Sequence, residues 1–268
     1  MTYFDETGRR IPDESMRVFS RESRKYYKLK QPELDLALIL NRIKKQNIIP
    51  EDFSLEDFEC SINLIIKKIE KNDNYKNILK GVFIPFAYKR SFVDADLGTE
   101  LVENLLPKLK DSFLSKFPKS EFKAILQSNA EMRGNITLDP HSRYSEFIKA
   151  SEQRVIVGLY FPQALQEYDV RSQRSQMVSL LKLDDLNHCL AGGLDMCAAL
   201  VGTPDILFHE DFYSPIPIMS AYQHTDSRMV LLLKAYGPHL EFWCMSQMLT
   251  MEITQISEQW TAGISFYE

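Results

Sequence analysis

Apolar residues recur with a helical period through much of the first part of the chain. In LEDFECSINLIIKKIEK, residues 55–71, apolar side chains fall every three or four positions, as they do on a helix with one buried face. Ser54, followed by Asp57, resembles a capping box at the start of this helix. In QPELDLALILNRIKKQ, residues 31–46, Pro32 suits the first helical position, and acidic residues precede basic ones as the helix dipole favours. Each stretch therefore predicts a helix.

Further stretches before residue 150 carry weaker patterns. Residues 99–117 predict a helix that bends at Pro107, and residues 119–133 predict another helix. The apolar and aromatic stretch GVFIPFAYKRSFV, residues 81–93, would allow a short strand, but a buried connection between helices fits its neighbours better. The stretch GNITLDPHSRY combines glycine, asparagine and an Asp-Pro pair, which favour turns. The first part is expected to be an irregular helical domain.

Short apolar segments alternate with tight turns in the second part. PQALQEY, QMVSLLKL, LNHCLAGG, LDMCAALVG, PIPIMSAYQ and DSRMVLLLKAYG each have the length of a short helix, and HLEFWCMSQMLTMEITQISEQW would supply one more pair. Helices this short are not stable in isolation, so they would have to stack on one another as in a solenoid. The chain as a whole is therefore expected to be all-α.

Residues 216–237 have the pattern of a helical hairpin. Pro217 would set the first turn, Ala221 would let two helices approach, and Gly237 would end the second helix. This stretch resembles the ankyrin repeat, whose ~33 residues open with T-P-L-H-x-A. A weaker copy, with Gly193 at the turn between its helices, precedes it by about one family period.

The resemblance to the ankyrin-repeat family is degenerate and covers residues 183–240. Met219 stands where the family has histidine and Ile216 where it has threonine, so the hydrogen bonds of those residues are missing. The resemblance implies an ankyrin-like helical-hairpin array over residues 151–268. It also implies a surface that binds other proteins.

The distribution of charge changes near residue 150. Up to that residue the chain has 26 Lys and Arg against 23 Asp and Glu, a net charge of +3, and beyond it 6 against 14, a net charge of −8. The shift suggests two domains, residues 1–150 and 151–268, although one domain with uneven faces would also produce it. The acidic second part suits a protein partner with a basic surface, which would steer association more than tighten it.

Composition and motifs argue against several classes of function. No apolar run of about 18 residues predicts a membrane span, and no apolar segment of a Sec-type signal peptide follows the first charged residues. The four cysteines lack metal or disulfide spacing, and neither HExxH, GxGxxG nor a P-loop occurs, so neither a metal nor a cofactor is expected. The basic and aromatic run RVFSRESRKYYKLK would suit nucleic acid, but the acidic protein favours a solvated helix face or an arm.

An enzyme is the alternative function. The loop LDPHSRY brings an acid, a base and an anion-binding group together as Asp139, His141 and Arg143. Loops on rigid scaffolds often carry function. A hydrolase or transferase would then have an N-terminal active site near residues 139–144, with the repeats as a targeting module. The simpler interpretation is a turn at the Asp-Pro pair followed by a helix cap.

Protein–protein interaction is the function that the sequence favours. The loop PDILFHEDFYSP mixes charge with aromatic anchors through His209, Glu210, Asp211, Phe212 and Tyr213. The two aromatic residues are the stronger candidates, since aromatic residues are enriched in binding hot spots. Free thiols favour a cytoplasmic protein. The Lys-, Ile- and Asn-rich first part suits an AT-rich bacterial genome. Bacteria that live inside host cells secrete ankyrin-type proteins as effectors, so by analogy the resemblance implies, as an alternative, an effector secreted into a host cell without a Sec signal. The sequence predicts no particular oligomeric state.

Overall fold

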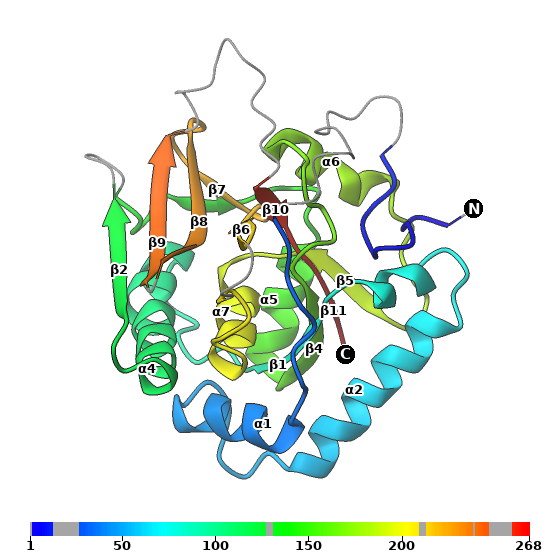
Figure 1. Cartoon of the computed structure of the whole chain (residues 1–268), viewed down its shortest axis with the longest axis horizontal. Helices are drawn as coiled ribbons and strands as arrows, with labels where there is room; N and C mark the ends of the chain where they lie inside the picture. The colour runs from blue at the N-terminus through cyan, green and yellow to red at the C-terminus, as the bar shows by residue number, and fades with distance from the viewer. Residues whose placement is uncertain (1, 13–26, 127–130, 209–212, 238, 247–258) are drawn as a thin grey trace.

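A computed structural model gives the fold of the chain and describes residues 2–12, 27–126, 131–208, 213–237, 239–246 and 259–268. The described residues form a mixed α/β structure with sheets of four, five and two strands (Figure 1). The expectation of an all-α protein is therefore wrong.

The four-stranded sheet is antiparallel throughout. Its strands, in spatial order, are β1 (Ile84–Tyr88), β4 (Ile156–Phe161), β11 (Ile264–Tyr267) and β5 (Asn187–Leu190). Every residue of β1, β4 and β11 is buried, which explains why these strands are mostly apolar instead of alternating. The stretch around β1, interpreted from the sequence as a buried connection between helices, is a strand.

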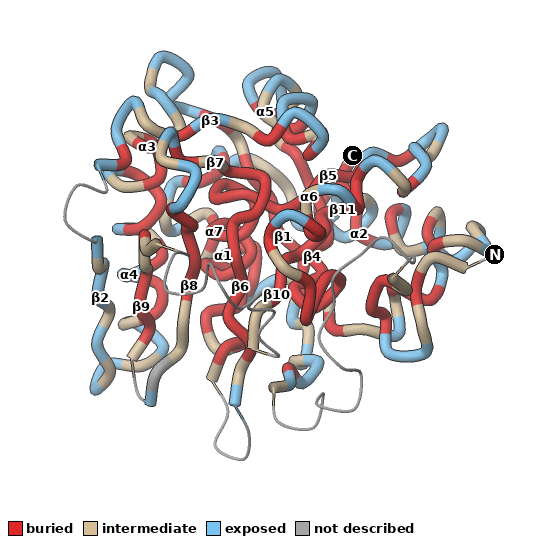
Figure 2. Tube along the Cα trace, turned by 90° about the horizontal axis from the view of Figure 1, so that it is seen from above, coloured by how far each residue is buried: buried red, intermediate tan, exposed pale blue. Residues whose placement is uncertain are grey.

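The five-stranded sheet combines parallel and antiparallel pairs. Its strands, in spatial order, are β10 (Trp260–Ala262), β6 (Ile216–Ile218), β8 (Met229–Tyr236), β9 (His239–Ser246) and β2 (Glu121–Leu126). β10 is parallel to β6 and β2 is parallel to β9, whereas β8 is antiparallel to both of its neighbours. β2 forms an edge of the sheet, and its residues are exposed or half-buried (Figure 2). A separate antiparallel ladder pairs β3 (Ile136–Leu138) with β7 (Tyr222–His224).

Helices surround these sheets, and one helix is buried among them. The α-helices are α1 (Leu36–Lys45), α2 (Leu55–Glu70), α3 (Leu97–Thr99), α4 (Leu106–Lys116), α5 (Tyr144–Gln153), α6 (Val170–Ser179) and α7 (Gly193–Gly202). A 3-10 helix, η2 (Lys76–Lys80), precedes β1, and a π-helix, η3 (Glu100–Leu105), joins α3 to α4. All ten residues of α7 are buried, and α7 packs against β1, α1 and α4. Within the described ranges, every helix is too short or too polar to cross a bilayer.

Local capping signals determine where the first helices begin. The Asp35 side chain accepts a hydrogen bond from the Leu38 backbone N–H at 2.9 Å, so α1 begins after Asp35 and not at Pro32. Ser54 accepts from the Asp57 N–H at 3.0 Å, which confirms the expected cap of α2. The helix expected around Pro107 is also present, but this proline lies in the first turn of α4, directly after η3.

Strands replace most of the helical hairpins expected between residues 183 and 240. Pro217 lies in β6 and pairs with Thr261 of β10, and the apolar run that was expected to form the second helix lies in β8. The prediction of an ankyrin-like helical-hairpin array is therefore wrong. One of its expected helices, LDMCAALVG, does form a helix and belongs to α7. The reason is physical: a short apolar run in the middle of a sheet has the same periodicity as a segment of a buried helix. Residues 119–133, also expected to be helical, begin with β2.

The main hydrophobic core includes residues from both sides of residue 150. β1 pairs with β4 across this position. Buried side chains of α1, α2, α7 and β11 belong to the same cluster, and Figure 2 shows the buried positions concentrated around α7 and the two larger sheets. The main core is therefore built from residues on both sides of residue 150, and a smaller cluster, which contains Val170, Ile218 and Val230, lies apart from it.

Gly98 marks a place where two segments approach too closely for a side chain. It is buried in α3, and a Cβ at this position would lie 1.8 Å from the Met132 backbone oxygen. We expect Gly98→Ala to lower the free energy of unfolding by about 1–3 kcal/mol, because overpacking forces the backbone to shift. Urea unfolding followed by circular dichroism measures the loss. Asp94→Ala, at an exposed position of the same connection, should change stability by less than about 0.5 kcal/mol. Equal losses would contradict the steric explanation.

Candidate functional site

A groove follows α1 on the surface of the molecule. Its wide end has a volume of about 940 Å³ and lies between residues 30–35, the C-terminal end of α4 and residues 203–208. A second hollow, of about 470 Å³, lies between α1 and α4. Leu38, Arg42 and Lys116 line both hollows, so the two are neighbours along α1, and we call them together the α1 groove. Residues 27–35, which contribute to its wide end, cross the front of the molecule in Figure 1.

Two hydrogen bonds attach the walls of the α1 groove to the end of α7. Arg42 Nη1, from α1, donates to the Gly202 carbonyl at 3.1 Å, and Ser112 Oγ, from α4, donates to the Val201 carbonyl at 2.7 Å. Both carbonyls belong to the last turn of α7, where helix carbonyls need partners from outside the helix. The positive charge of Arg42 also interacts favourably with the C-terminal end of the helix dipole. The buried helix α7 thus holds α1 and α4 on either side of the groove.

The wide end of the α1 groove contains three carboxylates and exposed lysines. Glu33, Asp35 and Asp205 line it together with Lys30 and Lys116. Lys116 Nζ lies 3.6 Å from Asp205 Oδ2, and the two side chains are 41% and 38% exposed. An ion pair this exposed contributes less than about 1 kcal/mol, so a ligand could exchange with Lys116 at little cost.

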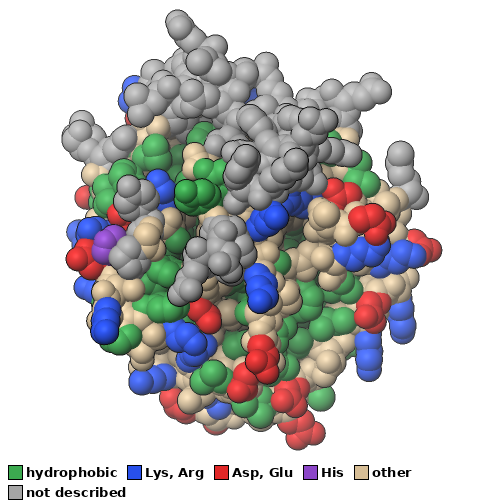
Figure 3. All heavy atoms as spheres, viewed as in Figure 1, with side chains coloured by type: hydrophobic (Ala, Val, Ile, Leu, Met, Phe, Trp, Pro, Cys, Tyr) green, Lys and Arg blue, Asp and Glu red, His purple; other side chains and the backbone are tan. Residues whose placement is uncertain are grey.

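The narrow end of the α1 groove is basic. Lys45, Arg42 and Lys116 line it, against one carboxylate, Asp111. Arg42 lines the wide end as well, so its three carboxylates are balanced by three cations, and the net charge along the groove changes from about zero beside the start of α1 to basic beside its end. Figure 3 views the molecule from the side of Figure 1 and shows acidic, basic and hydrophobic side chains interspersed on this face.

Aromatic rings and one hydroxyl complete the lining of the wide end. Phe117 and Phe208 are stacked, with ring centroids 4.9 Å apart and an interplanar angle of 25°, and Phe113 contacts both rings. Thr203, directly after α7, is only 3% exposed, and its hydroxyl has no hydrogen-bond partner among the described residues. A buried hydroxyl without a partner costs about 1–3 kcal/mol.

The loop expected to bind a partner contributes to the α1 groove. Part of it lies outside the described residues, namely His209, Glu210, Asp211 and Phe212. Tyr213 is described and is 70% exposed; its ring centroid is 5.9 Å from that of Tyr27, and its carbonyl accepts from the Lys28 N–H at 2.9 Å. Asp205 and Phe208, from the start of the same loop, line the wide end of the groove.

Asp139 and His141, from the alternative active site, do not face one another. Asp139 is buried, and its Oδ2 accepts a hydrogen bond from Gln223 Nε2 at 2.7 Å and lies 3.9 Å from Arg174 Nε. His141 is exposed at the surface of the turn. Its backbone N–H, and not its imidazole, donates to Asp139 at 3.0 Å. The Asp139 side chain therefore anchors the turn, as the simpler interpretation expects.

Arg143, the third residue of that site, connects α5 to the end of α6. Its backbone is left-handed, with φ of 60°, and its Nη2 donates to the carbonyls of Met177, at 2.9 Å, and Leu180. Its Nη1 donates to Nε2 of His188. Burial of His188, with the positive charges of Arg143 and Lys182 nearby, lowers the pKa of this imidazole to about 3. The structure thus places the Arg143 guanidinium among carbonyls and a neutral imidazole, away from His141.

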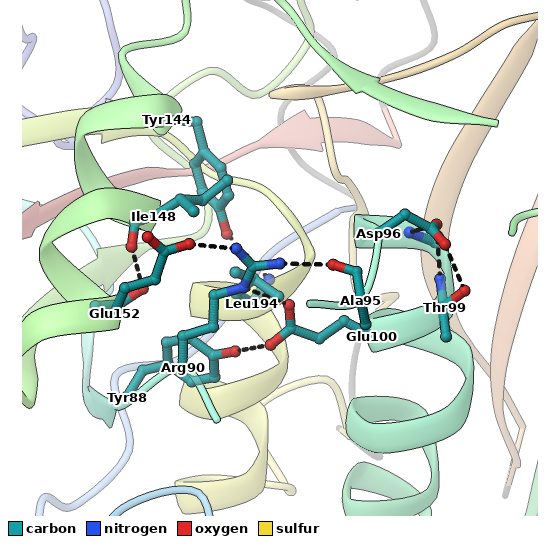
Figure 4. Close-up of polar contacts among 12 residues, drawn as sticks. Tyr88, Arg90, Ala95, Asp96, Thr99, Glu100, Tyr144, Ile148, Glu152 and Leu194 are labelled. Atoms are coloured by element: carbon teal, nitrogen blue, oxygen red, sulfur yellow. Dashed lines mark hydrogen bonds and ion pairs between the residues drawn. The ribbon is translucent and has the colours of Figure 1, made fainter. Parts of the chain in front are cut away.

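A second group of charged side chains is buried beside η3. Arg90 Nε donates to Glu100 at 2.8 Å, and its Nη1 donates to Glu152 at 2.5 Å (Figure 4). The Tyr88 hydroxyl donates to the other Glu100 oxygen, and Arg90 Nη2 donates to the Ala95 carbonyl at 2.8 Å. Glu100 is fully buried and Arg90 is 8% exposed. The members of this cluster point toward one another, so the cluster joins the end of β1 to η3 and α5 and is structural.

A buried carboxylate also lies at the start of α7. Asp195 Oδ1 accepts from the Tyr144 hydroxyl at 2.7 Å and from the Gly192 N–H at 2.9 Å. Its Oδ2 accepts from Ser265 Oγ at 2.5 Å. Burial raises the pKa of Asp195 to about 6, although these hydrogen bonds oppose the shift. The network joins α7 to α5 and β11 inside the core.

Three of the four cysteines are buried in the part of the chain that the structure describes. All four are free thiols; Cys60 is exposed, and Cys189, Cys197 and Cys244 are buried. Burial raises the pKa of each buried thiol, which disfavours the thiolate that a nucleophile needs. Among the described residues no group of three His, Cys, Asp or Glu side chains could hold a metal ion.

Sequence reasoning found the components of the α1 groove but not their arrangement. The periodic pattern predicts α1 and α4, and the loop containing Asp205 and Phe208 is expected to bind a partner. Nothing local indicates that these segments meet around the end of α7. One signal was available: Leu38, on α1, is an apolar residue outside the buried stripe, and it is 43% exposed in the groove.

Comparison with known proteins adds no functional assignment. The chain matches no protein-family model, no curated protein and no solved structure. The function is therefore inferred from the α1 groove itself.

Proposed function

We propose that the chain is a protein-interaction module whose α1 groove holds an extended segment of a partner protein. The observation that carries this proposal is that two neighbouring hollows, of about 940 Å³ and 470 Å³, follow α1 and share three lining residues. The ten residues of α1 span about 15 Å at 1.5 Å per residue. An extended chain covers this length with about four or five residues. A compact metabolite would fill one hollow, whereas an extended segment would occupy both.

Exposed apolar and aromatic side chains support the same proposal. Leu38, 43% exposed, lies where the two hollows meet. Tyr213, 70% exposed, contacts Tyr27, which precedes Lys30 of the wide end on the same segment. Burying such side chains against a partner removes apolar surface from water, and tyrosine is enriched among the residues that dominate binding energy.

Filling the groove should abolish partner binding. Ser115 is exposed on α4 and lines the narrow end, so Ser115→Trp would occupy the path of the bound segment without entering the core. Peptides selected from a random dodecapeptide library on the intact chain would serve as probes, with affinities measured by fluorescence polarisation. We expect Ser115→Trp to weaken binding by at least about tenfold, a loss of about 1.4 kcal/mol.

The matched control for this experiment is Lys110→Trp. Lys110 is exposed on the same helix but does not line the groove, so this variant adds the same ring elsewhere on α4. Its affinity for the selected peptides should stay within about twofold of the unmodified chain, because surface contacts outside the groove contribute little. Selected peptides that bind the Ser115→Trp and Lys110→Trp variants equally well, or no selected peptides at all, would contradict the proposed function.

A further inference from the structure

The wide end of the α1 groove combines carboxylates and aromatic rings with the cations Lys30, Arg42 and Lys116. Three carboxylates line it, and two of them, Glu33 and Asp35, lie beside the start of α1, while Asp205 lies opposite on the loop after α7. The stacked rings of Phe117 and Phe208 present aromatic surface in the same hollow. Carboxylates and aromatic faces both attract cations, the former by charge and the latter through the ring quadrupole.

One buried polar group at this end has no partner among the described residues. Thr203 is 3% exposed and lines the wide end, and none of the described residues forms a hydrogen bond with its hydroxyl. Buried hydroxyls in folded proteins nearly always have a partner.

We propose that the wide end of the α1 groove binds an arginine side chain of the partner segment, and that the narrow end binds an acidic side chain of the same segment. This inference rests on the proposed function, because it specifies which segment the groove holds. Arginine fits better than lysine, since a planar guanidinium can stack on Phe117 or Phe208 while it donates to a carboxylate. Lys45 and Arg42 at the narrow end provide the charge that an acidic side chain requires.

The cations already present in the groove are compatible with this occupant. Arg42 Nη1 donates to the Gly202 carbonyl, so the positive charge of Arg42 is partly balanced by the C-terminal end of the α7 helix dipole. Lys116 and Asp205 form a solvent-exposed pair, which a guanidinium can replace, since exposed pairs are weak. Released from Asp205, Lys116 still lines the narrow end, where it adds to the attraction for an acidic side chain. Lys30 is exposed and lies at the rim beside Glu33.

The length of the groove determines the spacing of the two charged residues. Asp35 caps the start of α1 and Lys45 is its last residue, which places them about 15 Å apart along the helix. At about 3.3 Å per residue, an extended segment has its arginine and its acidic residue about four or five positions apart. The inference therefore predicts a spaced pair of opposite charges, and not a basic or acidic run.

The test is a selection from the random dodecapeptide library on the intact chain, with the Ser115→Trp variant as the counter-target that removes peptides binding outside the groove. We expect the retained peptides to share an arginine followed or preceded by Asp or Glu at about four or five positions. A retained peptide is then measured against Asp205→Asn, and a second peptide has norleucine in place of its arginine. Each change should weaken binding by about tenfold, and the two together by little more than either alone, because both remove the same contact.

Asp94→Asn is the matched control, since Asp94 is exposed and does not line the groove. It should leave the affinity unchanged. Groove-dependent peptides without an enriched arginine, or additive losses for Asp205→Asn and the norleucine peptide, would overturn this inference while the proposed function stands. Failure to retain any groove-dependent peptide would overturn the proposed function itself. The two failures are thus distinguishable in one experiment.

Discussion

Replacing Glu100 with alanine is expected to lower the free energy of unfolding by about 3–5 kcal/mol. Glu100 is fully buried, and Arg90, which donates to it at 2.8 Å, is 8% exposed. Without this carboxylate, the buried charge of the Arg90 guanidinium is balanced only by Glu152, whose side chain is 35% exposed. It also removes the acceptor of the buried Tyr88 hydroxyl. Urea unfolding at neutral pH, followed by circular dichroism, measures the loss.

Glu103→Ala is the matched control on the same π-helix. Glu103 pairs with Arg133 at 2.7 Å, but these side chains are 45% and 58% exposed, so the expected loss is below about 1 kcal/mol. A third variant, Arg90→Met with Glu100→Leu, replaces both charges by apolar groups and should be less destabilised than Glu100→Ala alone, since no buried charge remains unpaired. Similar losses for Glu100→Ala and Glu103→Ala would show that burial of the pair does not govern its contribution.

Acidification is expected to remove stability through His188. Its pKa is about 3 in the folded protein, because the imidazole is buried beside Arg143, against about 6.5 in an unfolded chain. The folded state therefore excludes a proton that the unfolded state binds. Neutral His188 makes its full contribution to the free energy of unfolding above about pH 6.5, and this contribution decreases as the pH falls toward 3. At about 1.4 kcal/mol per pH unit, it should fall by about 2–3 kcal/mol between pH 6.5 and 4.5.

Asp195 has the opposite dependence and would mask this effect in the unmodified protein. Its pKa is raised to about 6 by burial, so the stability that comes from the protonated form is complete below about pH 4 and is lost as the pH rises through 6. The two contributions offset one another between pH 6 and 4.5. The measurement must therefore be the difference in unfolding free energy between the unmodified chain and His188→Asn, taken at each pH.

That difference should shrink by about 2–3 kcal/mol from pH 6.5 to 4.5, because asparagine does not titrate. The matched control is His141→Asn, at an exposed histidine on the neighbouring turn, and its difference from the unmodified chain should stay constant within about 0.5 kcal/mol. A constant difference for His188→Asn as well would mean that His188 titrates normally in the folded state.

Elements with complete local signals were predictable, and elements defined by their neighbours were not. The start of α2 is determined by Ser54 and its buried face by a helical period, both of which are contained in one stretch of sequence. The run of β8 is apolar because β6 and β9 flank it and both of its faces are covered, which the run itself does not reveal. The helical hairpin expected from this run is therefore wrong, and Pro217 lies in strand β6.

The candidate site also combines features that the local sequence predicts with features that depend on the tertiary fold. Asp205 and Phe208 lie at the start of the loop that was expected to bind a partner, and they do line the α1 groove. The groove itself exists because Arg42 and Ser112, which are far apart in the sequence, both reach the last turn of α7. Contacts of this kind depend on the tertiary fold, so no local pattern predicts them.

Strand β11 lies between β4 and β5, although it follows both of them in the sequence. During synthesis, about a hundred residues separate the appearance of β4 from that of β11, which at 5–20 residues per second corresponds to about 5–20 s. Throughout this interval the nascent chain carries strands without their central partner, with unpaired backbone groups and uncovered apolar faces. The four-stranded sheet can therefore be completed only after residues 264–267 have been translated.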